Sequence, residues 1–273
     1  MNEWDGSANF SAYTEVEALA NYRSGRALDA YRDERLQKYE PYVRFFRALG
    51  VPPDGLRVVD IGAGSSAFLY QLERSGVLLA GTALELSVSR HEFAERWRHD
   101  AGFYRVTNIC SNFADVRLSP GGFDRVSVLD DTYLYLRPES EDYPSLLLGA
   151  AHEALTPGGS LVLDFRNDLP LARAMAPEGR TFETDLPASN AFSRAVYRQW
   201  SSRDGRWLRN ESTYFSEDRE RRHKVEVTEV CDVDALAVSL PAYGYSDVSL
   251  YGDLAMTAFD AEKSARAIVV AKK

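Results

Sequence analysis

The chain has 273 residues, of which 45% are hydrophobic and 27% are charged. This length and composition predict one large globular domain, or one domain that carries an insertion. The formal net charge of -9 argues against nucleic acid as a partner, because binding a phosphate backbone requires a basic face.

Cysteine usage and hydropathy indicate the cellular compartment in which we expect the protein. The two cysteines, Cys110 and Cys231, form no CxxC pair, so we expect neither a disulfide framework nor a metal site. The acidic N-terminal segment lacks a basic stretch followed by an apolar core. No stretch approaches the roughly 20 apolar residues that span a bilayer. We therefore expect a soluble, cytoplasmic protein with no membrane partner.

The predicted elements begin with helix over residues 12–49, where aromatic side chains recur near helical spacing. A Pro-Pro-Asp-Gly sequence at 52–55 then breaks the chain. From there strands alternate with helices, and the strands are predicted over 56–61, 78–86, 105–111, 123–130 and 160–165. This alternation predicts a parallel sheet covered by helices on both faces, whose ligands bind beyond the carboxyl ends of the strands.

The pattern changes after the fifth strand. Three strands without helices between them are predicted over 192–200, 206–215 and 223–233. A helix over 234–243 and two last strands over 246–251 and 266–271 follow. The predicted organisation is an N-terminal helical cap over 1–50, a core formed by 51–183 and 234–273, and an antiparallel β insertion over 184–233. We expect the insertion to act as a lid or substrate region.

The first strand ends in an acid and opens into a glycine turn. Asp60 precedes Gly62 and Gly64, and such turns bring a nucleotide close to bare backbone. The glycines also fit a loose dinucleotide pattern, with Glu85 near the spacing of a ribose-binding acid. A pyrophosphate would be repelled by Asp60 and by Asp130 at the neighbouring strand end. S-adenosylmethionine carries a sulfonium, an ammonium and no phosphate, so an acidic cleft favours it.

Five motifs in order extend this argument to a family. The segments 58–64, 84–86, 111–115, 123–131 and 155–161 resemble the motifs of class I S-adenosylmethionine-dependent methyltransferases. The resemblance implies an α/β fold with a Rossmann-like, mostly parallel sheet of seven strands, whose last strand runs antiparallel. Ser66 stands where the family has its third glycine, which affects only how tight the turn is.

The resemblance also implies a cofactor site at the carboxyl edge of the sheet. Glu85 would accept hydrogen bonds from both ribose hydroxyls, because a carboxylate matches a vicinal diol. Asp60 would hold the cofactor ammonium, and Asn112 would accept a hydrogen bond from the adenine amino group. The residues assigned to the cofactor by the motifs are Asp60, Gly62, Ala63, Gly64, Glu85, Leu86, Asn112, Phe113 and Asp130.

A second resemblance rests on less of the chain. The insertion is similar to that of the small-molecule branch that includes glycine and nucleotide-sugar N-methyltransferases. The segment 22–26 resembles the N-terminal segment of that branch, which adds Tyr22 and Arg26 to the expected cofactor contacts. Candidate substrate contacts are Tyr135, Tyr197, Trp200 and Tyr214, and Asp131 is a candidate general base.

The expected reaction is methyl transfer to a small-molecule acceptor, with nitrogen or oxygen favoured over carbon. Three alternatives stay open: a non-catalytic protein that binds the same cofactor, an NAD-dependent oxidoreductase, and transfer of another group from a decarboxylated cofactor. The sequence leaves open whether the chain is a monomer or a homo-oligomer.

Overall fold

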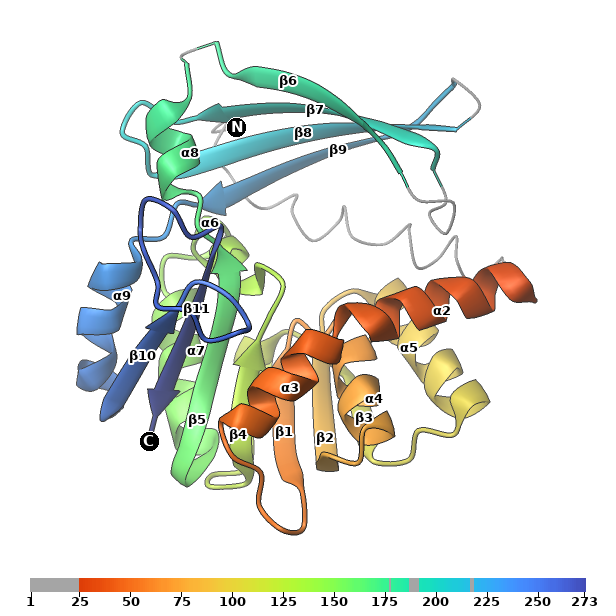
Figure 1. Cartoon of the computed structure of the whole chain (residues 1–273), viewed down its shortest axis with the longest axis vertical. Coiled ribbons are helices and arrows are strands. Elements are labelled where there is room, and N and C mark those ends of the chain that lie inside the picture. The colour runs from red at the N-terminus through yellow and green to blue at the C-terminus, as the bar shows by residue number, and fades with distance from the viewer. Residues whose placement is uncertain (1–24, 177, 187–191, 217–218) are drawn as a thin grey trace.

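Two sheets form the protein in the computed structural model, which describes residues 25–176, 178–186, 192–216 and 219–273. The larger sheet has seven strands in the order β10-β11-β5-β4-β1-β2-β3 (Figure 1). Its strands are β1 (Leu56–Ile61), β2 (Leu78–Glu85), β3 (Val106–Cys110), β4 (Phe123–Val128), β5 (Leu155–Arg166), β10 (Asp247–Tyr251) and β11 (Arg266–Lys272).

The pairing directions confirm the predicted fold class. β1 runs parallel to β2 and β4, and β5 runs parallel to β4. β11 lies antiparallel to both β5 and β10, as the resemblance implied for the last strand. All residues of β1 except Arg57 are buried, because helices cover both faces of a parallel sheet.

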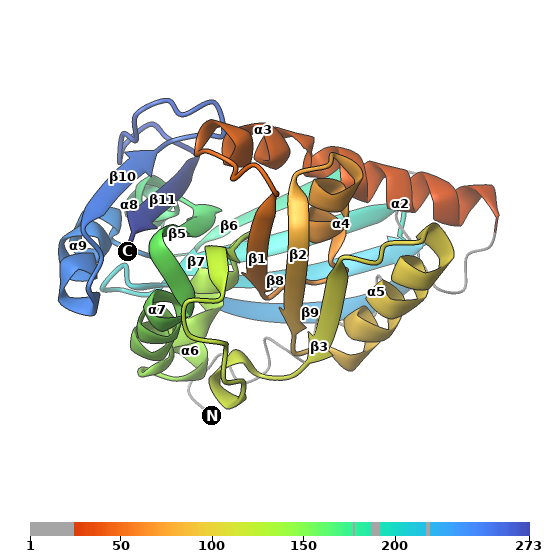
Figure 2. The same cartoon turned by 90° about the horizontal axis from the view of Figure 1, so that it is seen from below.

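The large sheet divides the apolar core into two clusters, one on each of its faces. Helices cover both faces (Figure 2). One face is covered by α2 (Arg26–Lys38), α3 (Glu40–Ala48), α4 (Ala67–Arg74) and α5 (Val88–Ala101). The other face is covered by α6 (Leu136–Glu139), α7 (Tyr143–Ala154) and α9 (Val233–Ser239). Trp97 and Phe46 lie in the first cluster, and Phe165 lies in the second. No helix among the described residues is long and apolar enough to cross a membrane.

The smaller sheet lies across the carboxyl ends of the parallel strands (Figure 1). It is antiparallel, in the order β6 (Arg180–Asp185), β7 (Arg194–Ser201), β8 (Trp207–Ser216) and β9 (Arg219–Glu229). The sequence predicts three strands here, and that number is wrong. The missed strand, β6, has six exposed residues and no apolar alternation, and it begins before the expected boundary at 184. A short helix, α8 (Leu169–Ala174), connects the two sheets.

Other boundaries differ from prediction by a few residues. β5 begins at Leu155 rather than at 160, with a register irregularity opposite β4 that takes up the Pro-Gly-Gly turn. α9 ends at Ser239 and continues as a 3-10 turn, η4 (Leu240–Tyr243), because Pro241 lacks the amide hydrogen that an α-helix needs. The part of the predicted N-terminal helix before Gly25 lies outside the described residues.

The N-terminal helices are tied to the strand ends by two tyrosines. Tyr39, where α2 and α3 meet, donates a hydrogen bond to the Asp130 carboxylate at 2.6 Å. Tyr42 donates to the buried carboxylate of Asp164 at the end of β5, which also accepts from Arg266 at 2.8 Å. These contacts fix α2 as a wall beside the carboxyl edge of the sheet.

Candidate active site

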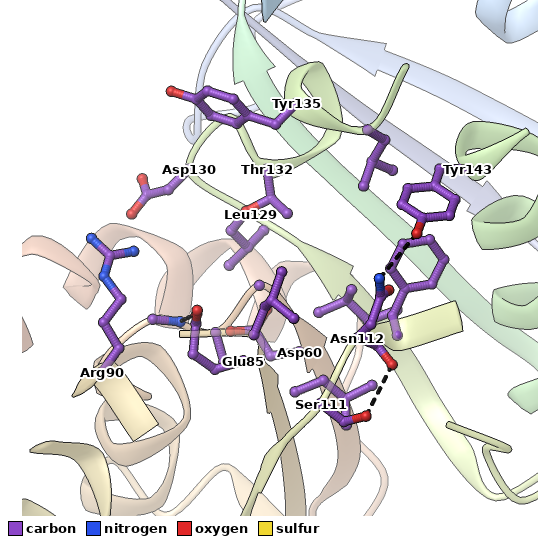
Figure 3. A pocket seen from close by; sticks show the side chains of 18 of the residues that line it. Asp60, Glu85, Arg90, Ser111, Asn112, Leu129, Asp130, Thr132, Tyr135 and Tyr143 are labelled. Atoms are coloured by element: carbon purple, nitrogen blue, oxygen red, sulfur yellow. Dashed lines mark hydrogen bonds between the residues drawn. The ribbon is translucent and has the colours of Figure 1, made fainter. Parts of the chain in front are cut away.

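A cavity of about 330 Å³ opens at the carboxyl edge of the large sheet. This volume is at the lower end of the roughly 300–1,000 Å³ typical of ligand pockets. Figure 3 shows Asp130 and Arg90 on one side of it and Asn112 with Tyr143 on the other. The predicted residues that line it are Asp60, Gly62, Ala63, Gly64, Glu85, Leu86, Asn112, Phe113, Asp130 and Tyr135.

The glycine turn after β1 has the backbone conformation that glycine permits. Gly62 has a φ of 75° and Gly64 a φ of 57°, both in the left-handed region. A Cβ on Gly62 would collide with the side chain of Thr132. Ser66, also left-handed with a φ of 58°, precedes α4 and forms no side-chain cap.

Glu85 joins the glycine turn to the end of β2. Its Oε2 accepts a hydrogen bond from the Gly64 amide at 2.7 Å, and its Oε1 accepts from the Ser87 amide at 2.7 Å. A carboxylate offers about four acceptor positions, so both oxygens retain capacity toward the cavity. Two backbone donors thus hold the Glu85 carboxylate in place at the cavity wall.

Asp60 is 3% exposed and its Oδ1 accepts a hydrogen bond from the Ser127 hydroxyl at 2.7 Å. Burial raises the pKa of Asp60 to about 8, and the nearby Asp130 and Glu85 carboxylates act in the same direction. At neutral pH its carboxyl is therefore largely protonated before a ligand binds. The repulsion of a pyrophosphate by Asp60, argued from the sequence, is correspondingly weaker.

Asp130 and Asp131 are adjacent left-handed residues whose side chains point to different places. Asp130 accepts from Lys38 at 2.5 Å and from Tyr39, and it lines the cavity. Burial opposes its ionisation, but the Lys38 ammonium, the Tyr39 hydrogen bond and the Arg35 charge together outweigh burial and lower the pKa of Asp130. Asp131 instead accepts from the Arg166 amide at 2.7 Å and from Arg266. Asp131 thus braces β5 and lies outside the described cavity lining, and its role as a general base stays a prediction.

The apolar end of the cavity contains Asn112, Phe113 and Tyr143. The Asn112 Oδ1 accepts from the Ala114 amide at 3.0 Å and caps a 3-10 turn, η2 (Phe113–Asp115). Its Nδ2 donates to the Tyr143 hydroxyl at 3.1 Å (Figure 3). The Phe113 ring meets Tyr143 edge to face at 5.4 Å between centroids. Asn112 therefore caps a turn and also forms part of the cavity wall.

Several predicted contacts lie elsewhere. Arg26 is exposed at the start of α2, outside the described lining, and Tyr22 precedes the described residues. Trp200 lies outside the described cavity lining, and the Arg209 guanidinium lies over its ring. Tyr197 and Tyr214 pack against each other at 6.4 Å between centroids and lie outside the cavity lining.

The motifs missed the positive charges of the site. Four carboxylates and four cations line the cavity, so it is not simply acidic. The cations are Arg35, Lys38, Arg90 and Lys224, and the carboxylate that the sequence did not indicate is Glu226. Arg35 and Lys38 lie on one face of α2, spaced three residues apart, and this is the one signal that could have identified them. Among the described residues no cluster of His, Cys, Asp or Glu could hold a metal ion.

Structure comparison identifies the fold. The methyltransferase CcbJ from Streptomyces caelestis is 18% identical with a TM-score of 0.73, covering 96% of this chain and 97% of that one. An S-adenosylmethionine-dependent methyltransferase from Clostridium acetobutylicum is 13% identical with a TM-score of 0.70, covering 86% and 91%. CalS10, an amino pentose methyltransferase from Micromonospora echinaspora, is 18% identical with a TM-score of 0.63, covering 94% of each chain.

No protein-family model and no curated protein sequence matches the chain. The structural likeness extends over nearly the whole length and includes both sheets. The chain therefore has the class I S-adenosylmethionine-dependent methyltransferase fold.

Proposed function

We propose that the protein transfers a methyl group from S-adenosylmethionine to a small-molecule acceptor. The observation that carries the proposal is Glu85, a carboxylate at the end of β2 held by the Gly64 amide at the cavity wall. This placement suits a ribose diol, and Leu86 and Phe113 offer apolar surface for an adenine ring beside it. The residues present thus fit the adenosine part of the cofactor.

The charges at the opposite end fit the amino-acid part. Asp130 pairs with Lys38 at 2.5 Å and Arg35 lines the same cavity, so the wall offers both signs of charge. A zwitterion with an ammonium and a carboxylate matches such a wall better than a diphosphate does. A decarboxylated cofactor lacks the carboxylate that Arg35 and Lys38 could contact, which argues against transfer of another group.

When bound, the cofactor would supply an electrophilic methyl group on a sulfonium. The chain would contribute alignment of donor and acceptor and exclusion of water. The small sheet lies over the cavity, and Lys224 and Glu226 of β9 reach its lining. Nitrogen is the favoured acceptor atom, because Glu226 can accept hydrogen bonds from the N–H groups of an amine. Among the similar structures, CalS10 is described as an amino pentose methyltransferase and KedS8 as a sugar N-methyltransferase.

Calorimetry with S-adenosylhomocysteine tests the cofactor assignment. We expect saturable binding to the wild-type chain and a loss of at least about tenfold in Glu85→Gln, since hydrogen bonds to charged groups contribute about 1.5–3 kcal/mol. Glu183→Gln, an exposed residue of β6 outside the cavity lining, is the matched control and should bind normally. Absence of binding by the wild-type chain would refute the proposal.

Two rival functions give different results in the same assays. An NAD-dependent oxidoreductase would be saturated by NAD and not by S-adenosylhomocysteine. A non-catalytic binder would bind S-adenosylhomocysteine but transfer no labelled methyl group to any acceptor.

A further inference from the structure

A second cavity, of about 130 Å³, lies between the two sheets and adjoins the first. Tyr135 and Glu226 line both cavities, so the two spaces share one wall. The Tyr135 hydroxyl donates to the Glu226 carboxylate at 2.8 Å, and Lys224 pairs with the same oxygen at 2.5 Å. Glu226 is only 9% exposed. A buried carboxylate therefore marks the junction of the cofactor cavity and the second cavity.

A row of polar side chains leads away from this junction across all four strands of the small sheet. Glu226 lies opposite Asn210, Asn210 lies opposite Gln199, and Gln199 lies opposite Arg180. Directly opposed residues in antiparallel strands point to the same face. All four of these residues line the second cavity, and Arg180 donates to the Gln199 side chain at 2.7 Å.

One atom of this row lacks a partner. Asn210 donates through Nδ2 to Ser212 at 3.2 Å and to Glu226 at 3.5 Å. Its Oδ1 is buried and has no hydrogen-bond partner among the described residues. Buried acceptors without donors are uncommon in folded proteins because they lose hydration without compensation. The Oδ1 of Asn210 thus calls for a donor that the ligand would supply.

We propose that the second cavity binds the methyl acceptor, a polyhydroxylated amine that lies along the row formed by Arg180, Gln199, Asn210 and Glu226. The amine lies at Glu226, facing the cofactor cavity, and a hydroxyl donates to the Asn210 Oδ1. This inference rests on the proposed function and adds to it the location and chemistry of the acceptor.

The reaction at this junction balances without a further reactant. An acceptor that arrives as an ammonium releases one proton to solvent before it reacts. The neutral nitrogen then attacks the methyl carbon, the C–N bond forms and the C–S bond breaks with its electron pair left on sulfur. The product is an N-methylammonium, and its N–H groups donate hydrogen bonds to the Glu226 carboxylate. Glu226 thus orients the nitrogen lone pair by holding the N–H groups away from the methyl carbon.

Three six-membered-ring compounds separate the features of the proposed acceptor. Glucosamine has both the amine and the hydroxyls, glucose lacks the amine, and cyclohexylamine lacks the hydroxyls. With labelled S-adenosylmethionine we expect transfer to glucosamine at a kcat/KM at least tenfold above that for cyclohexylamine, and none to glucose. Equal or better use of cyclohexylamine, or no transfer to glucosamine, would overturn the acceptor assignment.

Variants locate the acceptor in the second cavity. Asn210→Ala and Glu226→Gln should raise the KM for glucosamine tenfold or more, with S-adenosylhomocysteine affinity within about twofold for Asn210→Ala. Because Asn210→Ala removes an unpartnered acceptor, its melting temperature should equal or exceed that of the wild type. Glu183→Gln, which pairs with Arg194 and lies outside the lining of both cavities, is the control and should behave as wild type.

The outcomes keep this inference apart from the proposed function. If the wild-type chain does not bind S-adenosylhomocysteine, the proposed function fails. If it binds S-adenosylhomocysteine and methylates glucosamine, but Asn210→Ala leaves the KM unchanged or lowers cofactor affinity as much as acceptor affinity, the second cavity is not the acceptor site.

Discussion

Asp60→Asn should make the ligand-free protein more stable at neutral and alkaline pH while weakening cofactor binding. Asp60 is buried, and burial raises its pKa from 3.8 to about 8. Between these values the native chain holds a proton that the unfolded chain has released. The free energy of unfolding therefore falls as pH rises from about 4 to about 8. Asparagine cannot ionise, so the variant does not lose stability in this window.

The size of the effect follows from the shift. Each pKa unit corresponds to about 1.4 kcal/mol, so at pH 7 the three units above the unfolded value give an upper limit of about 4 kcal/mol. The new carboxamide can accept from Ser127 but brings an N–H₂ group that also needs a partner. We therefore expect a net gain of about 2 kcal/mol at pH 7–8, which shrinks toward zero near pH 4.

Urea denaturation across pH 4–9 measures this difference. Asp124→Asn is the control with the opposite sign, because hydrogen bonds from Arg57 lower the pKa of Asp124 despite its burial. That variant should be less stable than wild type above about pH 4, and the difference should disappear in acid. If the advantage of Asp60→Asn does not grow between pH 5 and pH 8, the argument from burial is wrong.

The same Asp60→Asn variant should bind S-adenosylhomocysteine about tenfold or more weakly, because the neutral side chain no longer attracts the ligand ammonium. Isothermal titration calorimetry measures the loss at pH 8, which is close to the pKa of the wild-type Asp60 carboxyl. Unchanged affinity with increased stability would show that Asp60 has a structural role only.

Three further substitutions test the architecture around the site. Gly62→Ala should cost about 2–3 kcal/mol, because it strains a positive φ and collides with Thr132, and Thr132→Ala should recover part of the loss in urea denaturation. Tyr42→Phe should cost about 1–2 kcal/mol by removing a buried donor to Asp164, with the apolar packing retained. Asp131→Asn should lower the melting temperature but change S-adenosylhomocysteine affinity less than twofold, because Asp131 pairs with Arg166. A selective loss of kcat would instead support the prediction that Asp131 is a general base.

The fold could be predicted because its signals are local. The strand Leu56–Ile61, the glycine turn after it and the acid at the end of β2 are each contained in a few residues. Parallel strands place their carboxyl ends at the same edge of the sheet, so Asp60, Glu85 and Asp130 could be placed together without coordinates. All three line the cavity.

The charges across the cavity could not be predicted in the same way. Lys38 reaches Asp130 from a helix 92 residues earlier in the chain, and Lys224 comes from a strand of the insertion. Such pairs depend on how elements pack, which no local pattern reports. Pairing with Lys38 changes the chemistry of the edge from acidic to mixed, and it changes the fitting ligand from a cation to a zwitterion.

The aromatic residues of the insertion differ from the residues of the proposed acceptor row. Phe182 and Tyr197 stack at 5.0 Å between centroids, so their large apolar surfaces are used within the sheet itself. Asn210 and Gln199 resemble the residues of any exposed strand in the sequence. Only the register, which places them in one row with Glu226, makes them a surface that faces a cavity. A shift of one residue in β8 would turn Asn210 to the outer face and bring Glu211 or Arg209 inward. The proposed acceptor row therefore depends on strand register, which the aromatic content of the insertion does not report.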